Sequence, residues 1–168
     1  TTQEIYRRAF AHLRQMRRPI AARYSLKRAI LEFGPSGFPF EAYLAHLFDA
    51  EGYTTKIDQI IKGACVEHEV DVVMQKGGVT TYVEAKFHNS AGFKTDLKVA
   101  LYVKARLDDI AAANAAIKLS GQGLIATNTK FTDKAEQFAA CAGVPLLGWD
   151  TPHGDTLHNK IERTGLYP

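Results

Sequence analysis

Three charged side chains near the middle of the chain have the types and the spacing that a hydrolytic site requires. Asp71 lies in residues 69–75, and Glu84 and Lys86 lie in residues 80–87, two stretches whose composition predicts strands. Because side chains alternate between the faces of a strand, Glu84 and Lys86 share one face. If the two strands pair, Asp71 joins them, and two carboxylates and an ammonium group converge on one patch.

The segment between these strands determines how they pair. Gly77-Gly78 supplies the positive φ values that a two-residue hairpin turn needs, so Lys76 should face Val79. Counting back from this pair places Asp71 directly opposite Glu84. The other face of the hairpin is apolar and is expected to be core; it comprises Val70, Val72, Met74, Thr81, Val83, Ala85 and Phe87.

This cluster has the composition of a metal-dependent phosphodiesterase. Phosphodiester hydrolysis needs an activated water and stabilisation of the negative charge that grows on the phosphoryl oxygens. Mg²⁺ meets both needs and binds through one or two carboxylates, here Asp71 and Glu84. Lys86 would orient the water or neutralise the phosphate. The alternative is a structural ion-pair network across two strands, but burying such charge beneath helices is costly without a metal or a partner.

The hairpin lies within a longer series of motifs. These are residues 63–71 and 82–89, Phe40-Glu41, residues 127–132 and Leu147-Gly148-Trp149. Together they resemble the PD-(D/E)xK nuclease superfamily and, within it, the Mrr-like restriction endonucleases. The resemblance spans about residues 38–168, and the combination is far more specific than the D…ExK pattern alone.

The resemblance also implies a role for each matching position. Asp71 and Glu84 would be metal ligands, with the main-chain carbonyl of Ala85 as a third ligand. Lys86 would be the catalytic lysine. Glu41 would be the acidic residue that this superfamily often supplies from its first core helix, and its alternative role is an acid favoured by the helix dipole. Two departures are visible: no proline precedes Asp71, and Glu84 stands where the Mrr-like group often has glutamine.

Polar residues near the ends of the predicted strands are candidates for contacts with a nucleic-acid backbone, since ligands approach such sheets there. They are His88, Asn89, Lys94 and Lys130. His88 shares the face of Lys86 in the expected register, and a hydrogen-bonded structural role is its alternative. Asn128 is expected to serve in a turn.

The first 33 residues are strongly basic. They hold eight basic and two acidic side chains, a local balance of +6 in a chain whose net charge is +3. Such asymmetry is compatible with a phosphate-rich partner, although an exposed pair of helices with solvated arginines would show it too. Residues 4–8 and 21–29 resemble the tail of an ATP-cone domain. Its phosphate-binding front is missing, so nucleotide binding by this segment is not expected.

The expected elements place a boundary early in the chain. The breaker at residues 34–39 divides a basic helical segment, residues 1–37, from a nuclease domain, residues 38–168. We expect helices at 3–15, 19–33, 40–50, 95–119, 132–142 and 156–164, and strands at 54–61, 69–75, 80–87, 123–127 and 144–149. This order predicts an α/β fold with a restriction-endonuclease-like core, in which a mixed central sheet is flanked by helices and preceded by a helical extension.

The composition of the chain bears on where the protein is located. The chain is 46% hydrophobic and 23% charged, and no apolar run reaches the roughly 18 residues that a membrane helix needs. No secretory signal opens it, and its two cysteines are isolated, which predicts reduced thiols in a cytoplasmic protein. The chain ends without a settled final element, so we expect it to be a piece of a longer protein.

The sequence therefore predicts a Mg²⁺-dependent endodeoxyribonuclease, with Mn²⁺ as a substitute metal and DNA as the partner. A homodimer is expected if both strands of a duplex are cut, because two cuts need two sites. Two alternatives stay open: a structure-specific repair or junction-resolving nuclease with the same site, and a catalytically silent module that senses DNA or nucleotides.

Overall fold

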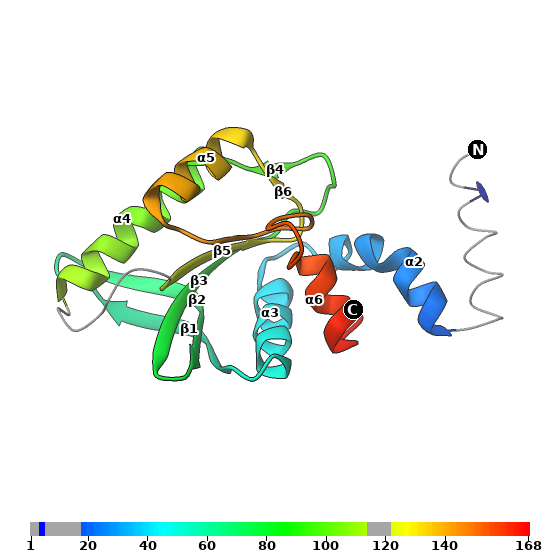
Figure 1. The fold of residues 1–168 in the computed structure, drawn as a ribbon, viewed down its shortest axis with the longest axis horizontal. Helices are drawn as coiled ribbons and strands as arrows, with labels where there is room; N and C mark the ends of the chain where they lie inside the picture. The colour runs from blue at the N-terminus through cyan, green and yellow to red at the C-terminus, as the bar shows by residue number, and fades with distance from the viewer. Residues whose placement is uncertain (1–3, 6–17, 114–121) are drawn as a thin grey trace.

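The computed structural model describes residues 4–5, 18–113 and 122–168 (Figure 1). Its helices are α2 (Arg18–Leu31), α3 (Phe38–Ala50), α4 (Leu97–Ala113), α5 (Asp133–Ala142) and α6 (Leu157–Thr164). Its strands are β1 (Thr54–Lys62), β2 (Glu67–Lys76), β3 (Val79–Lys86), β4 (Lys94–Thr95), β5 (Gly123–Thr127), β6 (Lys130–Phe131) and β7 (Leu146–Leu147). The predicted α/β order is confirmed, with the short strands β4 and β6 in addition. The helix expected at 3–15 lies almost wholly outside the described residues.

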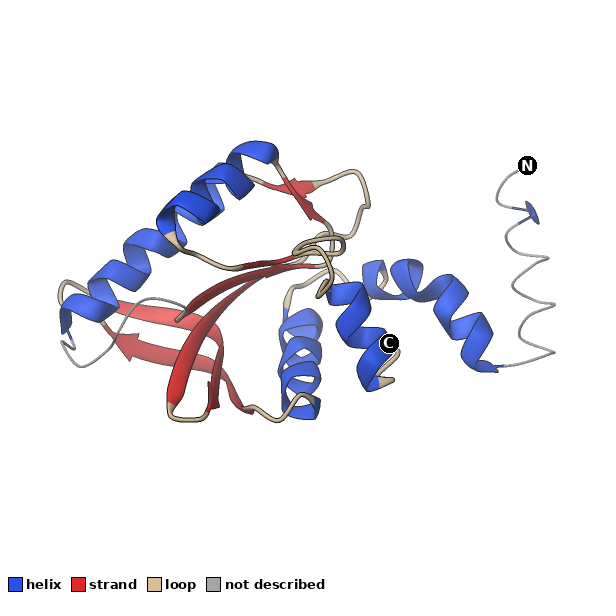
Figure 2. Cartoon of the chain, viewed as in Figure 1, coloured by secondary structure: helices blue, strands red, loops and turns tan. Residues whose placement is uncertain are grey.

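The main sheet of the described residues is mixed, as predicted. Its five strands follow the order β1-β2-β3-β5-β7. The β1–β2 and β2–β3 pairs are antiparallel, whereas β5 pairs in parallel with both β3 and β7. A separate parallel pair, β4 with β6, stands apart from this sheet (Figure 2). The parallel strands end together beside this pair, so chain segments leaving β3 and β5 meet at one edge of the molecule.

Helices cover both faces of the sheet (Figure 1). On one face, Leu44 of α3 and Ile161 of α6 are fully buried with Val72 and Val83 of the hairpin. On the other face, α4 and α5 pack over β5, whose Ile125 is fully buried. The sheet is therefore covered on both sides, and charge on its central strands is shielded from water.

The hairpin has the predicted register. Lys76 pairs with Val79 across Gly77 and Gly78, whose φ values are 58° and 78°. The ladder continues to the pair Val72 and Val83, and the next positions along it are Asp71 and Glu84. The two glycines are thus required by the turn, and they place the two carboxylates at the point where the strands separate.

The predicted assignment of β2 side chains to the two faces of the sheet is correct for the residues after Asp71 and wrong for Val70 before it. Val72 and Met74 pack toward α3 as expected, but Val70 packs in the cluster beneath α4 and α5, so its predicted face was wrong. The β1 residue opposite Asp71 is Asp58, whose φ of 52° is left-handed. This irregularity interrupts the pleat and reverses which side chains face each layer.

Two other elements have different bounds from those expected. The helix predicted at 95–119 is described from Leu97 to Ala113, and residues 114–121 lie outside the described part. The strand predicted at 144–149 is reduced to Leu146–Leu147, because the chain turns at Gly148 toward α6.

None of the helices in the described ranges combines the length and the apolarity that a membrane crossing requires.

Candidate active site

Glu84 is the most enclosed carboxylate of the candidate site, with 4% of the residue exposed. Among the described side chains, three donate to it. Lys86 Nζ lies 2.6 Å from Oε1, Arg106 Nη1 lies 2.5 Å from Oε2, and the Tyr102 hydroxyl also bonds to Oε1. Burial acts to raise the pKa of Glu84, but the hydrogen bonds from Lys86 and Tyr102 and the charge of Arg106 lower it. The carboxylate is therefore held ionised.

Lys86 is half-buried one strand repeat away from Glu84. Burial acts to lower its pKa, yet the hydrogen bonds with Glu84 and Tyr102 raise the pKa above its ordinary value. The ammonium also lies 5.6 Å from the centre of the Tyr102 ring, and the Arg106 guanidinium lies 5.4 Å from it. Lys86 is thus a permanent cation in a fixed position.

Asp71 lies at the fork where β2 and β3 separate. Its Oδ2 accepts a hydrogen bond of 2.6 Å from the main-chain N–H of Ala85. Burial and the charge of Glu84 raise the pKa of Asp71, while the Ala85 bond and the charges of Lys86 and Arg106 act against this rise. The structure therefore brings Asp71, Glu84 and Lys86 together, and it leaves Asp71 with less compensating positive charge than Glu84.

Glu41 approaches the same patch from the first turn of α3. Burial raises its pKa to about 7, with further contributions from the negative charges of Asp71, Asp58, Glu69 and Glu84. Gly37 gives the side chain room, since a Cβ there would lie 3.0 Å from Glu41 Oε1. Helix α3 thus adds a carboxylate to the negative side of the hairpin patch.

These groups differ in how well they suit a divalent cation. Within the described ranges, no group of three or more His, Cys, Asp and Glu side chains is arranged to hold a metal ion. The donor set is instead carboxylates plus a main-chain carbonyl, which are hard oxygen ligands of the kind that Mg²⁺ uses together with water. Burial, and then the neighbouring carboxylates, raise the pKa values of Asp71 and Glu41, so a bound cation would favour their ionised forms. Asp71, Glu84 and Glu41 are therefore donors of the type that suits a hard divalent cation.

The candidate nucleic-acid contacts form two groups. His88 is anchored by its neighbours: its main-chain N–H donates to Asn128 Oδ1 at 2.8 Å, and its ring Nε2 lies 3.1 Å from Thr95 Oγ1. Lys94 and Lys130 are cross-strand partners in the β4–β6 pair, and Lys130 also bonds to Asp150. Asn89 is exposed in the loop after β3.

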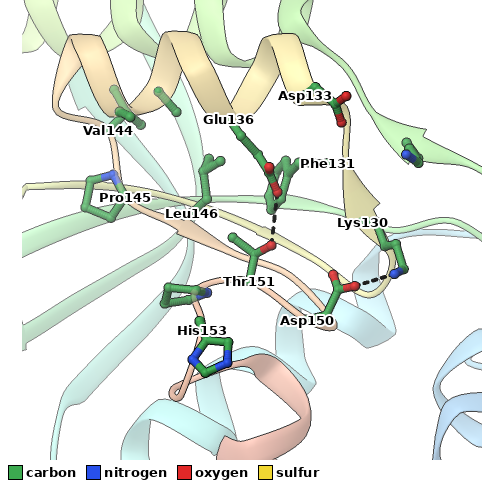
Figure 3. Close-up of a pocket in the computed structure, with 14 residues that line it drawn as sticks. Lys130, Phe131, Asp133, Glu136, Val144, Pro145, Leu146, Asp150, Thr151 and His153 are labelled. Atoms are coloured by element: carbon green, nitrogen blue, oxygen red, sulfur yellow. Dashed lines mark hydrogen bonds and ion pairs between the residues drawn. The ribbon is translucent and has the colours of Figure 1, made fainter.

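A groove of about 690 Å³ runs between α5, the start of β7 and the loop before α6. Figure 3 shows Lys130 turned toward Asp150 at one end, and Glu136 bonded to Thr151 near the middle. The hairpin carboxylates do not line this groove. Its charges are largely paired with one another, so the hairpin patch remains the candidate for chemistry.

Sequence reasoning missed the two α4 side chains that bind Glu84. Tyr102 and Arg106 are four residues apart, so they lie on the same face of the helix. The four-residue spacing is visible in the sequence and indicates that the two polar side chains share a face, whereas the prediction treated this helix as a mixture of apolar and charged positions. Asn128, expected in a turn, is fully buried and bonds to both the N–H and the carbonyl of His88.

The mixed sheet between helical layers, with acidic residues and a lysine at the fork of its central hairpin, defines a restriction-endonuclease-like nuclease domain. The profile of the restriction endonuclease family Mrr_cat matches residues 35–151. A curated protein of Archaeoglobus fulgidus, described as uncharacterized, is 38% identical over 125 residues, which cover 74% of this chain and 68% of the relative. The chain belongs to the Mrr_cat restriction endonuclease family.

Two solved structures resemble this fold. The crystal structure of a protein of unknown function, AF1548, aligns with a TM-score of 0.71 and 36% identity, covering 79% of this chain and 69% of that one. Can2 from Sulfobacillus thermosulfidooxidans, solved with cyclic tetra-adenylate, aligns with a TM-score of 0.50 and 16% identity over 76% of this chain and 36% of its own. The latter similarity concerns the fold alone.

Proposed function

We propose that this chain is a Mg²⁺-dependent endodeoxyribonuclease domain that hydrolyses DNA phosphodiester bonds. The observation that carries the proposal is the convergence of Asp71, Glu84 and Lys86 at one buried fork, where Lys86 lies 2.6 Å from Glu84. Membership of the restriction endonuclease family supports DNA as the substrate. Mn²⁺ has a similar preference for oxygen ligands and is expected to replace Mg²⁺.

Each residue has a role in this mechanism. Asp71, Glu84 and the Ala85 carbonyl would hold the metal, and Glu41 would add a carboxylate from α3. When bound, the metal supplies charge stabilisation and lowers the pKa of a coordinated water. Lys86 keeps its proton and places a fixed positive charge beside the phosphate. The water oxygen bonds to phosphorus as one P–O ester bond breaks, which leaves a phosphate monoester and a free hydroxyl, with no intermediate attached to the protein.

The wider assembly is also part of the proposal. A double-strand break needs two sites, so a homodimer is expected where both strands are cut. By their resemblance to an ATP-cone tail, residues 4–8 and 21–29 would belong to a segment, residues 1–37, that joins such a domain to the nuclease domain. Residues 1–37 alone are not expected to bind the nucleotide, because the phosphate-binding front is missing.

A plasmid-nicking assay tests the chemistry. Supercoiled DNA should become nicked with Mg²⁺ and stay intact with EDTA, and Lys86→Ala should lower the rate by about 100-fold or more, as expected for loss of a preorganised charge. Lys62→Ala, which removes an exposed lysine at the end of β1, is the matched control and should retain the wild-type rate. Metal-independent nicking, or equal rates for the Lys86 and Lys62 variants, would contradict the mechanism. DNA binding without any cleavage would favour a silent sensing module.

A further inference from the structure

Phe93 is an unusually exposed aromatic side chain beside the candidate active site. It is 62% exposed, in the loop that joins β3 to β4. One side of its ring stacks on the His88 imidazole, with 6.0 Å between ring centres and 11° between ring planes. This exposure leaves much of the Phe93 ring accessible to a partner, and covering it would remove apolar surface from water.

The support beneath this ring is rigid. Asn128 is fully buried and clamps the main chain of His88 through bonds of 2.8 and 2.7 Å. The His88 ring is fixed at 3.1 Å from Oγ1 of Thr95, which is 2% exposed. The main-chain N–H of Phe93 donates a hydrogen bond of 3.2 Å to the carbonyl of Ser90, and this turn closes the loop. The ring is thus presented at a set position with little conformational entropy left to lose on binding.

The surroundings of Phe93 suit a nucleic-acid strand. Lys94 follows it directly and lines a groove of about 560 Å³ between β4, α4 and α5. Two further lysines, Lys98 and Lys134, line this groove, so its lysines outnumber its two aspartates, Asp96 and Asp133. On the other side, His88 lies two residues beyond Lys86. Burial, and then the charge of Lys86, lower the pKa of His88, which favours the neutral imidazole. An accessible aromatic face flanked by lysines is the arrangement with which proteins hold single-stranded nucleic acid.

We propose that Phe93, backed by His88, is a stacking site for an unpaired nucleobase of the DNA substrate. This inference rests on the proposed DNA-cleaving function and narrows its substrate. Both faces of a base inside a duplex are covered by its neighbours, and unstacking it costs a few kcal/mol. The Phe93 face is therefore available chiefly to a base that is already unpaired, as in a bulge or a gap. Such DNA should bind more tightly than an intact duplex.

Fluorescence anisotropy with two matched DNAs tests the stacking site. One is an intact duplex and the other carries a single 2-aminopurine bulge, and Ca²⁺ replaces Mg²⁺ so that the strands stay whole. We expect the wild-type protein to prefer the bulge by about 5- to 150-fold, the range that stacking of one base supplies. Phe93→Ala should remove this preference and the quenching of 2-aminopurine, and Phe93→Trp should restore both.

The control is Ile60→Ala, which removes an apolar side chain of nearly the same exposure, 61%, from β1. It should bind both DNAs like the wild type. Equal binding of the bulge by wild-type and Phe93→Ala proteins would overturn the proposal, and so would an equal loss on both DNAs. The two proposals can fail independently. A preference for the bulge without Mg²⁺-dependent cleavage would support the stacking site and contradict the nuclease function. Mg²⁺-dependent cleavage without a preference for the bulge would support the nuclease function and contradict the stacking site.

Discussion

Glu84 shows how this protein maintains a charged group inside its core. A carboxylate that is only 4% exposed would be expensive to ionise alone, but Lys86 and Arg106 each approach it within 2.6 Å. Two cations therefore balance one anion, while the nearby Asp71 and Glu41 repel each other. A divalent cation at this patch would change the balance, because it would take over part of the role of Arg106 beside Glu84.

We predict that Arg106→Ala destabilises the metal-free protein. Breaking a buried ion pair costs about 3–5 kcal/mol, and the loss here should be nearer 2 to 3 kcal/mol because Lys86 still contacts Glu84. Urea unfolding in EDTA measures this loss. On addition of Mg²⁺ the deficit should shrink, since a bound cation would supply the missing charge. A deficit that Mg²⁺ leaves unchanged would show that Glu84 does not hold the metal.

The matched control for this arginine is Arg28→Ala. Arg28 also pairs with a carboxylate, Glu32 at 2.8 Å, but both side chains are more than 60% exposed. Exposed pairs contribute about 0 to 1 kcal/mol, so this variant should unfold close to the wild type with and without Mg²⁺. A similar loss in both variants would mean that burial of Glu84 is not what makes Arg106 important.

At the scale of elements, the loop between β1 and β2 is tied to α4 at Asp109, whose main-chain carbonyl accepts from Ala64 at 3.0 Å and whose side chain makes further bonds. Asp109 accepts main-chain bonds from Cys65 at 2.8 Å and Val66 at 3.3 Å, and it lies 2.7 Å from His68 Nε2. Gly63 is required beside it, since a Cβ there would lie 2.0 Å from Asp109 Oδ2. The carboxylate therefore fixes the loop that leads into the β2 strand of Asp71.

This contact predicts a pH-dependent effect of Asp109→Asn. The hydrogen bond from His68, with those from Cys65, lowers the pKa of Asp109 to about 2 in the folded protein. A depressed pKa stabilises the fold above the ordinary value for aspartate, near 4, and this stabilisation disappears as the pH falls toward 2. Asp109→Asn should therefore unfold more easily than the wild type at pH 7, and the difference should narrow at pH 3.

Urea titrations at the two pH values provide the measurement. Asp108→Asn is the control, because Asp108 is the adjacent aspartate on α4, is half-exposed and pairs within the helix with Lys104. Its effect should be small at both pH values. A loss for Asp109→Asn that is equally large at pH 3 and pH 7 would contradict the assigned role of the charge.

The elements also show how far the sequence could predict this molecule. The hairpin was predictable because Gly77-Gly78 fixes its register locally, and register determines where Asp71 and Glu84 meet. For Tyr102 and Arg106, the spacing places both side chains on one face of α4, but it does not say that this face meets Glu84, because that contact depends on how the helix packs on the sheet. The β4–β6 pair joins two-residue strands that are 36 positions apart from Lys94 to Lys130, and such short pairs leave no periodic pattern.

At the scale of the whole molecule, the last helix completes the core that supports the site. Leu157 and Ile161 of α6 are fully buried in the same cluster as Phe40 and Leu44 of α3, the helix that carries Glu41. Ion pairs outside this cluster hold the two helices together, with Lys160 Nζ at 2.9 Å from Glu51. Residues far apart in the chain therefore position one wall of the candidate site.

We predict that Ile161→Ala lowers the free energy of unfolding by about 2–5 kcal/mol, since it removes buried methyl groups and leaves a cavity beneath α3. Ile60→Ala makes the same chemical change at a residue that is 61% exposed, and it should lower the free energy of unfolding by less than about 0.5 kcal/mol. Urea denaturation followed by circular dichroism compares the two. If α6 belongs to one cooperative core with the sheet, the Ile161 variant should unfold in a single transition at lower urea. A wild-type midpoint with loss of only the α6 signal would show instead that this helix unfolds on its own and does not support Glu41.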